Sequence, residues 1–268
     1  MNRSRSLAVS SAVMLSAVLL FACATTRRAS QEGVSGVRLA VARDLVDRRQ
    51  YGDALAAIQA IHESEGRSAA TLTLRARAYR GQGNTGDAED DLREALRMDR
   101  DYAPAHAALA IMDDEAKRWA DGEGHHRRAA ELAPQNAAYL SDWGWALYRQ
   151  GRTQDALARL QQAVRLDPMP ARYHNNLGFA YARAGDFTRA AQQFASGGSP
   201  AEAKNNLGYA YELAGNLPQA FAAYSDAVRL APGFARARAN LEEVAKKLDR
   251  AVPSEPARPE KVPSGRMQ

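Results

Sequence analysis

AEAKNNLGYAYELAGNLPQAFAAYSDAVRLAPGF, residues 201–234, contains the complete pattern of one structural repeat. Apolar residues follow helical spacing up to Gly215, and the same spacing resumes after it and ends at Pro232. Within this stretch, NNLGYAY at 205–211 is nearly identical to NNLGFAY at 175–181. The pattern predicts two helices joined by a short turn, in a chain that copies this hairpin along its length.

Small residues reveal the period of the repeat. They recur every 34 residues, at Ala42, Ala76, Ala110, Gly144 and Gly178. Counted from the start of each repeat, small residues at positions eight and twenty let two antiparallel helices approach closely. Larger side chains at positions seven, eleven and twenty-four fill the space between them. Glycines at the predicted turns permit a left-handed backbone; they are Gly151, Gly185 and Gly215.

This pattern resembles the tetratricopeptide-repeat family, and the matching residues are Leu207, Gly208, Tyr211, Ala220, Tyr224, Ala227 and Pro232. The resemblance covers about three quarters of the chain and implies an all-α solenoid of helix-turn-helix hairpins. A single hairpin cannot bury its apolar face, so neighbouring repeats must share one core. We expect six repeats, at 35–68, 69–102, 103–136, 137–170, 171–200 and 201–234.

Two of these repeats depart from the pattern. Repeat 3 has Gly122 and His126 where alanine and an aromatic residue are expected. Repeat 5 is short, because ASGGSP at 195–200 ends its second helix about one turn early. After repeat 6, the polar stretch 235–248 predicts a capping helix. The proline-rich, charged segment 249–268 predicts a disordered tail.

The N-terminus has the features of a bacterial lipoprotein signal peptide over residues 1–22. An apolar run of fifteen residues, LAVSSAVMLSAVLLF, falls short of the ~20 needed for a permanent membrane-spanning helix. Cys23, the single cysteine, lies in LFAC, which resembles the lipobox whose cysteine is acylated, with palmitate among the acyl chains. Residues 23–34 would then be a tether, and Ala24 implies outer-membrane sorting. Ordinary cleavage in the small-residue pattern Ala22-Cys23-Ala24 is the alternative.

Composition and motifs argue against several other classes of protein. Without Arg3 and Arg5 of the signal segment, 34 basic and 31 acidic residues leave a charge of +3, too small for a nucleic-acid-binding surface. GQGNTG at 81–86 satisfies a dinucleotide motif on paper, but a predicted helix precedes it instead of a strand. His125 and His126 lack further metal ligands nearby in the sequence. We therefore expect no cofactor, no metal and no enzymatic activity.

A stripe of polar and aromatic residues lies opposite the predicted core positions of each first helix, at positions two, five or six, nine and thirteen. In the family, this stripe lines a concave groove that binds peptides. An asparagine amide can both donate to and accept from a peptide backbone; the alternative is that these asparagines brace neighbouring helices. The candidate groove residues are Trp145, Tyr148, Arg149, Arg172, Asn175, Asn176, Phe179, Arg183, Asn205, Asn206, Tyr209 and Asn240.

Taken together, these features predict an adaptor lipoprotein of the bacterial cell envelope. It would be anchored through Cys23 to the outer membrane, face the periplasm, and hold a partner protein or peptide in its groove. The combination of lipobox and repeats resembles the pilus assembly lipoproteins of the tight-adherence (TadD) type. It also resembles the type IV pilus pilotins, whose partner is a secretin. A periplasmic module that regulates peptidoglycan or outer-membrane machinery is the alternative.

Overall fold

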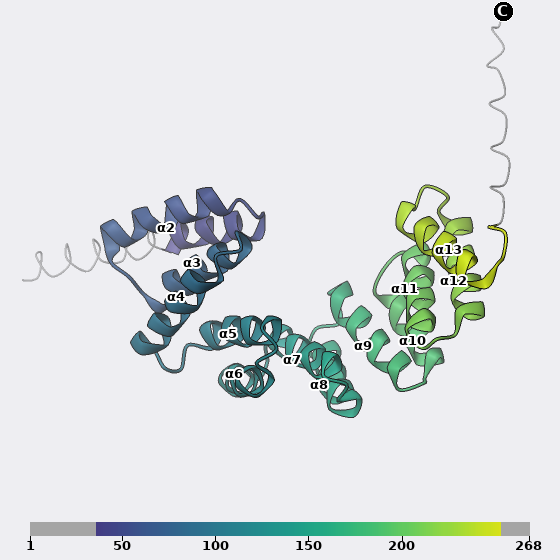
Figure 1. The fold of residues 1–268 in the computed structure, drawn as a ribbon. Helices are drawn as coiled ribbons and strands as arrows, with labels where there is room; N and C mark the ends of the chain where they lie inside the picture. Colours follow the sequence, from purple (N-terminus) through teal and green to yellow (C-terminus); the bar gives the residue numbers. More distant parts are fainter. Residues whose placement is uncertain (1–35, 253–268) are drawn as a thin grey trace, which may run out of the picture. The chain divides into compact units, whose positions relative to one another are not determined.

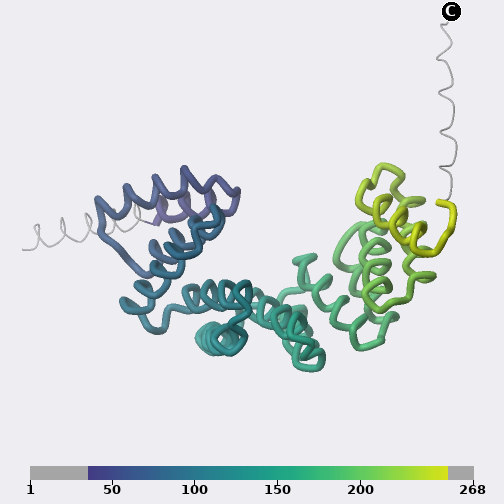
Figure 2. The backbone as a smooth tube through the Cα atoms, viewed as in Figure 1, coloured from purple at the N-terminus to yellow at the C-terminus, as the bar shows by residue number. Residues whose placement is uncertain are grey.

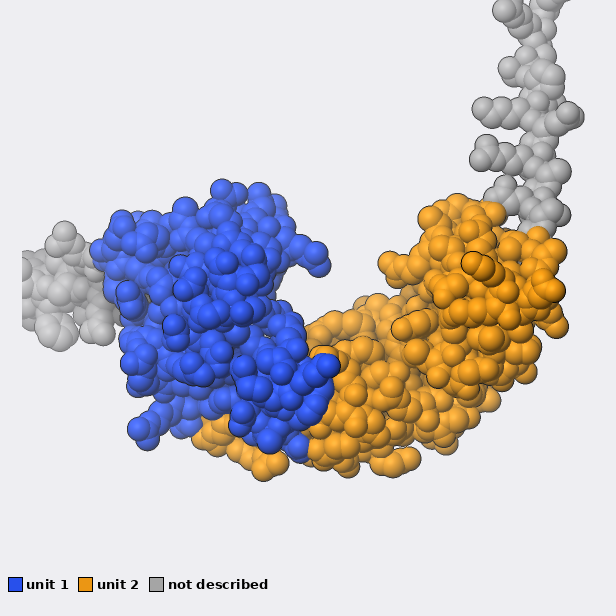
Figure 3. All heavy atoms as spheres, in the orientation of Figure 1, with its two compact units in different colours: residues 1–125 blue, residues 126–268 orange. Residues whose placement is uncertain are grey.

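The computed structural model describes residues 36–252, in which every regular element is a helix and no strand occurs. The predicted signal segment, Cys23, the whole predicted tether and residues 253–268 of the predicted tail lie outside the described residues. The chain forms two compact units, one up to His125 (unit 1) and one from His126 (unit 2), coloured separately in Figure 3. Each unit is described by itself.

Helical hairpins follow one another in both units (Figures 1 and 2). Unit 1 begins with a helix over residues 36–47. It continues with α2 (Tyr51–Glu65), α3 (Ala69–Gly81), α4 (Thr85–Met98), α5 (Ala103–Glu115) and the start of α6 (Trp119–Leu132). Unit 2 contains the end of α6 and then α7 (Ala137–Arg149), α8 (Thr153–Leu166), α9 (Ala171–Arg183), α10 (Phe187–Ser196), α11 (Pro200–Leu213), α12 (Leu217–Leu230) and α13 (Ala235–Leu248).

The turn inside each hairpin has a positive φ at position fifteen. Glycine occupies this position in four repeats, at Gly83, Gly151, Gly185 and Gly215, with φ between 75° and 87°. Arg49 and Lys117 occupy it in repeats 1 and 3, with φ of 62° and 60°. The left-handed conformation is costly for a residue with a Cβ. The turn geometry is therefore kept in all six repeats even where the sequence does not favour it.

Position eight is the point of closest approach between the two helices of a hairpin. A Cβ added to Gly144 would lie 2.6 Å from Leu160, and one added to Gly178 would lie 2.6 Å from the Phe194 ring. One added to Gly208 would lie 2.7 Å from the Tyr224 ring. Each partner is the fully buried residue at position twenty-four. The small and large positions expected from the sequence therefore pack against each other in repeats 4, 5 and 6.

Repeats 3 and 5 differ from the others in the packing between their helices and in helix length, respectively. In repeat 3, a Cβ on Gly122 would lie 2.9 Å from Asp114 Oδ1, and His126 at position twenty-four is 2% exposed. In repeat 5, α10 has 10 residues, whereas α8 and α12 each have 14. A serine cap starts the next helix after α10, because Ser199 and Glu202 form a capping box at the beginning of α11.

Helix α13 buries Ala237, and it packs Leu241 and Val244 in one cluster with Tyr224 of α12. Its other side is exposed and charged. Among the described residues, none of the helices combines the length and apolarity that crossing a membrane requires.

Candidate functional site

Three aromatic side chains at position nine form a row on the first helices of repeats 4, 5 and 6. Trp145 of α7 meets Phe179 of α9 with ring centroids 6.3 Å apart, and Phe179 meets Tyr209 of α11 at 5.9 Å. Both contacts are edge-to-face, the arrangement that aromatic quadrupoles favour. We call Trp145, Phe179 and Tyr209 the aromatic row.

The aromatic row is open to solvent at its C-terminal end. Tyr209 is 46% exposed, and Leu213, one turn further along α11, is 56% exposed. Trp145 and Phe179 are half-buried. The row is therefore a partly exposed apolar strip on three neighbouring helices, with a core beneath it that includes Phe194, 4.9 Å from Phe179.

Tyr148 of α7 lies beside Trp145 and, together with Arg183 of α9, extends the aromatic surface. Tyr148 stacks on Trp145 with centroids 4.8 Å apart, and the Arg183 guanidinium lies 3.9 Å from the centroid of the Tyr148 ring. Arg183 also donates a hydrogen bond to the backbone carbonyl of Tyr148. Burial raises the pKa of Tyr148, against an opposing effect of Arg183. The exposed side chains of Arg149 and Arg183 thus place positive charge beside the aromatic row.

The asparagines form hydrogen bonds to one another between repeats. Asn240 donates from Nδ2 to Oδ1 of Asn205 at 3.0 Å, and Asn206 donates to Oδ1 of Asn175 at 3.2 Å. Asn176 donates in the same way to Oγ of Ser141 at 3.2 Å. In each pair, the donor is at position six of one helix and the acceptor at position five of the preceding first helix. We call these three bonds the position-six ladder.

One member of the ladder also fixes the end of the short helix α10. Asn175 donates from Nδ2 to the carbonyl oxygen of Gly197 at 3.2 Å, and a Cβ on Gly197 would lie 2.7 Å from Asn175 Oδ1. Asn205 is 4% exposed, so its bond with Asn240 is shielded from water. These amides brace neighbouring helices, which was the alternative that the sequence left open. Each position-six amide keeps an acceptor oxygen and one N–H beyond its ladder bond.

Arg172, at position two, lies at the N-terminal end of the same face. It pairs with Asp142 at position six of repeat 4 at 2.7 Å, and its guanidinium lies 4.6 Å from the Tyr173 ring centroid. The structure thus brings the aromatic residues, Arg183 and the asparagines onto neighbouring helices, and it ties Arg172 to Asp142. Sequence reasoning missed Ser141 and Leu213, although their positions five and thirteen are those of other candidates.

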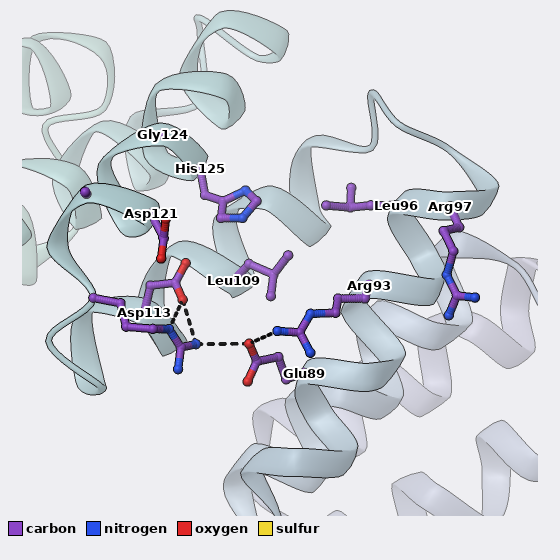
Figure 4. Close-up of a pocket in the computed structure, with 11 residues that line it drawn as sticks. Glu89, Arg93, Leu96, Arg97, Leu109, Asp113, Asp121, Gly124 and His125 are labelled. Carbon is purple, nitrogen blue, oxygen red and sulfur yellow. Dashed lines mark hydrogen bonds and ion pairs between the residues drawn. The ribbon is translucent and has the colours of Figure 1, made fainter.

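A second feature is a hollow of about 840 Å³ in unit 1, beside Leu96 of α4 and Leu109 of α5 (Figure 4). Arg118 bridges its two sides, at 2.7 Å from Asp113 and 3.1 Å from Glu89. At the rim, His125 Nδ1 lies 2.9 Å from His106 Nδ1. Within residues 36–252, no cluster of three or more His, Cys, Asp and Glu side chains could hold a metal ion. The hollow is a mixed-charge crevice between helices.

The charges of this hollow explain why the helices do not close over it. Glu89 and Arg93 of α4 occupy positions twenty-one and twenty-five of repeat 2, and they form an ion pair with 2.6 Å between the charged atoms. In repeat 4, the corresponding residues are Leu157 and Gln161. Because hydrated charges resist burial, this junction stays open where its counterpart in unit 2 is packed.

Comparison with known families identifies the repeats. Tetratricopeptide-repeat profiles match residues 69–102, 141–200 and 194–233. By sequence, the chain is 36% identical over 102 residues to the type IV pilus assembly protein PilF of Pseudomonas aeruginosa strain PAO1. That match covers 37% of this chain and 40% of PilF, so it spans less than half of either protein.

Solved structures show the same fold. The type IV pilus biogenesis factor PilW superposes with a TM-score of 0.65 at 18% identity, over 78% of this chain and 98% of PilW. The structure of Pseudomonas aeruginosa PilF gives a TM-score of 0.61 at 15% identity, over 79% and 98% of the two chains. The matched repeats of this chain are tetratricopeptide repeats in an all-α fold, and part of the chain is related in sequence to a pilus assembly protein.

Proposed function

We propose that the aromatic row and its flanking arginines bind a segment of a partner protein, and that the chain acts as an adaptor in the assembly of a pilus or related envelope machine. The observation that carries this proposal is the row itself, a partly exposed apolar strip on three neighbouring helices. Tryptophan, tyrosine and arginine are enriched among the few residues that carry most of the binding energy in protein interfaces. The sequence relation to PilF, a type IV pilus assembly protein, supports the setting.

The sequence suggested that asparagine amides hold the backbone of a bound peptide, and we now give the main role to the aromatic side chains. Each position-six asparagine already donates one of its two amide hydrogens to the position-six ladder. We therefore assign the main binding energy to Tyr209, Phe179 and Trp145. The remaining amide groups of Asn176, Asn206 and Asn240 are secondary contacts for a peptide backbone. Arg149 and Arg183 favour a partner segment that carries acidic residues beside its apolar ones.

The location is part of the same proposal and rests on the sequence. Acylation of Cys23 would tether the repeats to the outer membrane on the periplasmic side, where a secretin or pilus component is a fitting partner. Several acyl chains on one residue, each contributing ~0.8 kcal/mol per buried methylene, would anchor the protein firmly.

A site-specific cross-linking experiment tests the binding face. A photoreactive phenylalanine derivative at Tyr209 should give a discrete adduct in envelopes of the source cells, and the same group at exposed Gln219 of α12 should not. In the Tyr209 photoprobe background, Trp145→Ala should weaken the adduct about ten-fold, as expected for loss of an aromatic anchor. Equal adducts at both positions, or an adduct indifferent to Trp145→Ala, would show that the partner binds elsewhere.

A further inference from the structure

Three junctions between successive hairpins share one arrangement. In α5, α9 and α13, positions three and seven of the helix are buried against the hairpin that precedes it. At position seven, Leu109 is 5% exposed, Leu177 is 3% and Leu241 is 1%. At position three, the buried residues are Ala105, Tyr173 and Ala237. These two positions therefore belong to the interface between repeats.

Before α9 and before α13, the preceding second helix covers these positions with apolar side chains seven residues apart. Leu157 and Val164 of α8 pack in the cluster that contains Leu177. Phe221 and Val228 of α12 pack in the cluster that contains Leu241. The residues between them at position twenty-five are polar, Gln161 and Ser225. The chain thus shows which helix pattern fits this surface: large apolar residues at i and i+7, with a polar residue at i+4.

The first repeat presents the same surface without such a helix. Val37 at position three is 64% exposed and Val41 at position seven is 52% exposed. Together with Ala57, Ala60 and Ile61 of α2 they line a hollow of about 360 Å³. At its edge, Arg38 pairs with Glu65 at 3.2 Å. Among the described residues, no helix covers Val37 and Val41.

We propose that this face of the first repeat, formed by Val37, Val41, Ala57, Ala60 and Ile61, docks an amphipathic helix of a partner protein. The partner helix carries large apolar residues at i and i+7 around a polar residue, as α8 and α12 do. This site is separate from the aromatic row and does not depend on the function proposed for it. Docking there would continue the interface that the repeats already form with one another.

The other end of the described array does not offer this pattern to a second copy of the chain. The outer side of α13 exposes Arg236, Glu242, Glu243 and Lys246. Placing these charges on an apolar face would cost desolvation energy without compensating partners. This argues for a helix of another protein and against head-to-tail stacking of identical chains.

The probe is a peptide with the sequence of α8, TQDALARLQQAVRL, because this helix carries the fitting pattern. The peptide is stapled, because an isolated helix of this length is only marginally stable in water. We expect it to bind the full-length protein saturably. Val41→Glu should raise its Kd at least about ten-fold. A matched variant, Leu230→Glu, places the same charge on an exposed leucine of α12, outside both proposed sites, and should leave binding unchanged. A control peptide with serine in place of Leu157 and Val164 should also bind at least about ten-fold more weakly.

Cross-linking locates the site at which the peptide binds. A photoreactive group on the α8 peptide should label Val37, Val41 or the neighbouring part of α2, and unlabelled peptide should compete. Binding weaker than about 1 mM, or equal binding by the Val41→Glu variant, would overturn the proposal. So would a photoreactive group at Val41 that labels residues 1–35 of its own chain, or self-association of the protein that Val41→Glu abolishes. Thermal unfolding of both variants confirms that each remains folded.

Discussion

Asn240 donates a hydrogen bond to Asn205, 35 residues earlier, with 3.0 Å between Nδ2 and Oδ1. Asn206 and Asn175 form the same bond one repeat earlier. In the duplicated Asn-Asn pairs, the asparagine at position five thus accepts a hydrogen bond from the next repeat, and the one at position six donates a hydrogen bond to the preceding repeat. Each bond holds the first helices of two successive repeats in register.

Replacing Asn205 by alanine should destabilise the C-terminal part of unit 2. The change removes the acceptor of Asn240 at a site shielded from water, and a lost hydrogen bond of this kind costs about 1 kcal/mol. Thermal unfolding measures the loss, and hydrogen exchange should locate it in α11, α12 and α13. The triple variant Asn176→Ala, Asn206→Ala and Asn240→Ala should lower the melting temperature further. Unchanged stability together with lost partner affinity would instead mean that these amides serve mainly the groove.

Gly208→Ala tests the closest contact inside repeat 6. The new Cβ would lie 2.7 Å from the Tyr224 ring, and we expect overpacking to cost about 1 to 3 kcal/mol of unfolding free energy. Gly52→Ala is the matched control, because nothing lies within 4 Å of its added Cβ. In α2 that change should be neutral or stabilise by up to about 1 kcal/mol. Chemical denaturation of the two variants should therefore give shifts of opposite sign or of clearly different size.

Lys117→Gly should stabilise unit 1. Lys117 has a φ of 60° at the position where four other repeats have glycine, and glycine removes the cost of a left-handed conformation. The gain is partly offset by the greater freedom of glycine in the unfolded chain, which leaves about 0.5 to 1 kcal/mol. Gly151→Lys should produce the converse loss in unit 2. A destabilised Lys117→Gly variant would show that the lysine side chain contributes more than its backbone conformation costs.

Stability of unit 1 should fall as the pH drops below the ordinary pKa of histidine. Burial, assisted by the Arg75 charge, holds the pKa of His62 below its usual value, and its Nε2 lies 2.9 Å from Thr71 Oγ1. The unfolded chain therefore binds this proton more readily than the folded one, so acid favours unfolding. The slope should be less than about 1 kcal/mol per pH unit, because the ring is partly solvated. His62→Gln should make the unfolding free energy depend less steeply on pH between about pH 5 and 7, around the ordinary histidine pKa. If the variant shows the same slope as the wild type, His62 is not the source of the pH dependence.

Cys23→Ser tests the proposed anchor. If the sulfur carries the lipid, the variant should move from the membrane fraction to the soluble periplasmic fraction, and metabolic labelling with palmitate should be lost. A matched Ala24→Ser variant leaves the sulfur in place and should still fractionate with membranes. Unchanged fractionation of Cys23→Ser would refute the anchor.

The hairpins were predictable because their determinants are local. Gly215 and Pro232 mark the turn and the end of one repeat, and the spacing of small and large residues then gives the partner of Gly208 as Tyr224. The shortened α10 was likewise visible in the glycines after Ser196. The exposed stripe followed from the same spacing, since residues that do not face the core of a hairpin must face elsewhere.

The asparagine pairs were harder to interpret, because their partners lie one repeat away in the sequence. Helical periodicity shows that Asn205 and Asn206 lie off the intra-hairpin core face, but it does not give the rotation between successive hairpins. That rotation brings position six of one helix against position five of the one before. The charged hollow near Glu89 escaped prediction for the same reason, since it arises between helices of different repeats.

The position-six ladder also has a consequence for how such a chain can lengthen. A repeat with asparagine at both positions offers an acceptor to its successor and a donor to its predecessor, as Asn205 and Asn206 do. A tandem duplication of that segment would join copies that already fit each other, and it would add one hydrogen bond for every repeat gained. The twice-written heptamer is thus compatible with gene duplication, because a copied Asn-Asn pair supplies both the donor and the acceptor that a new junction needs.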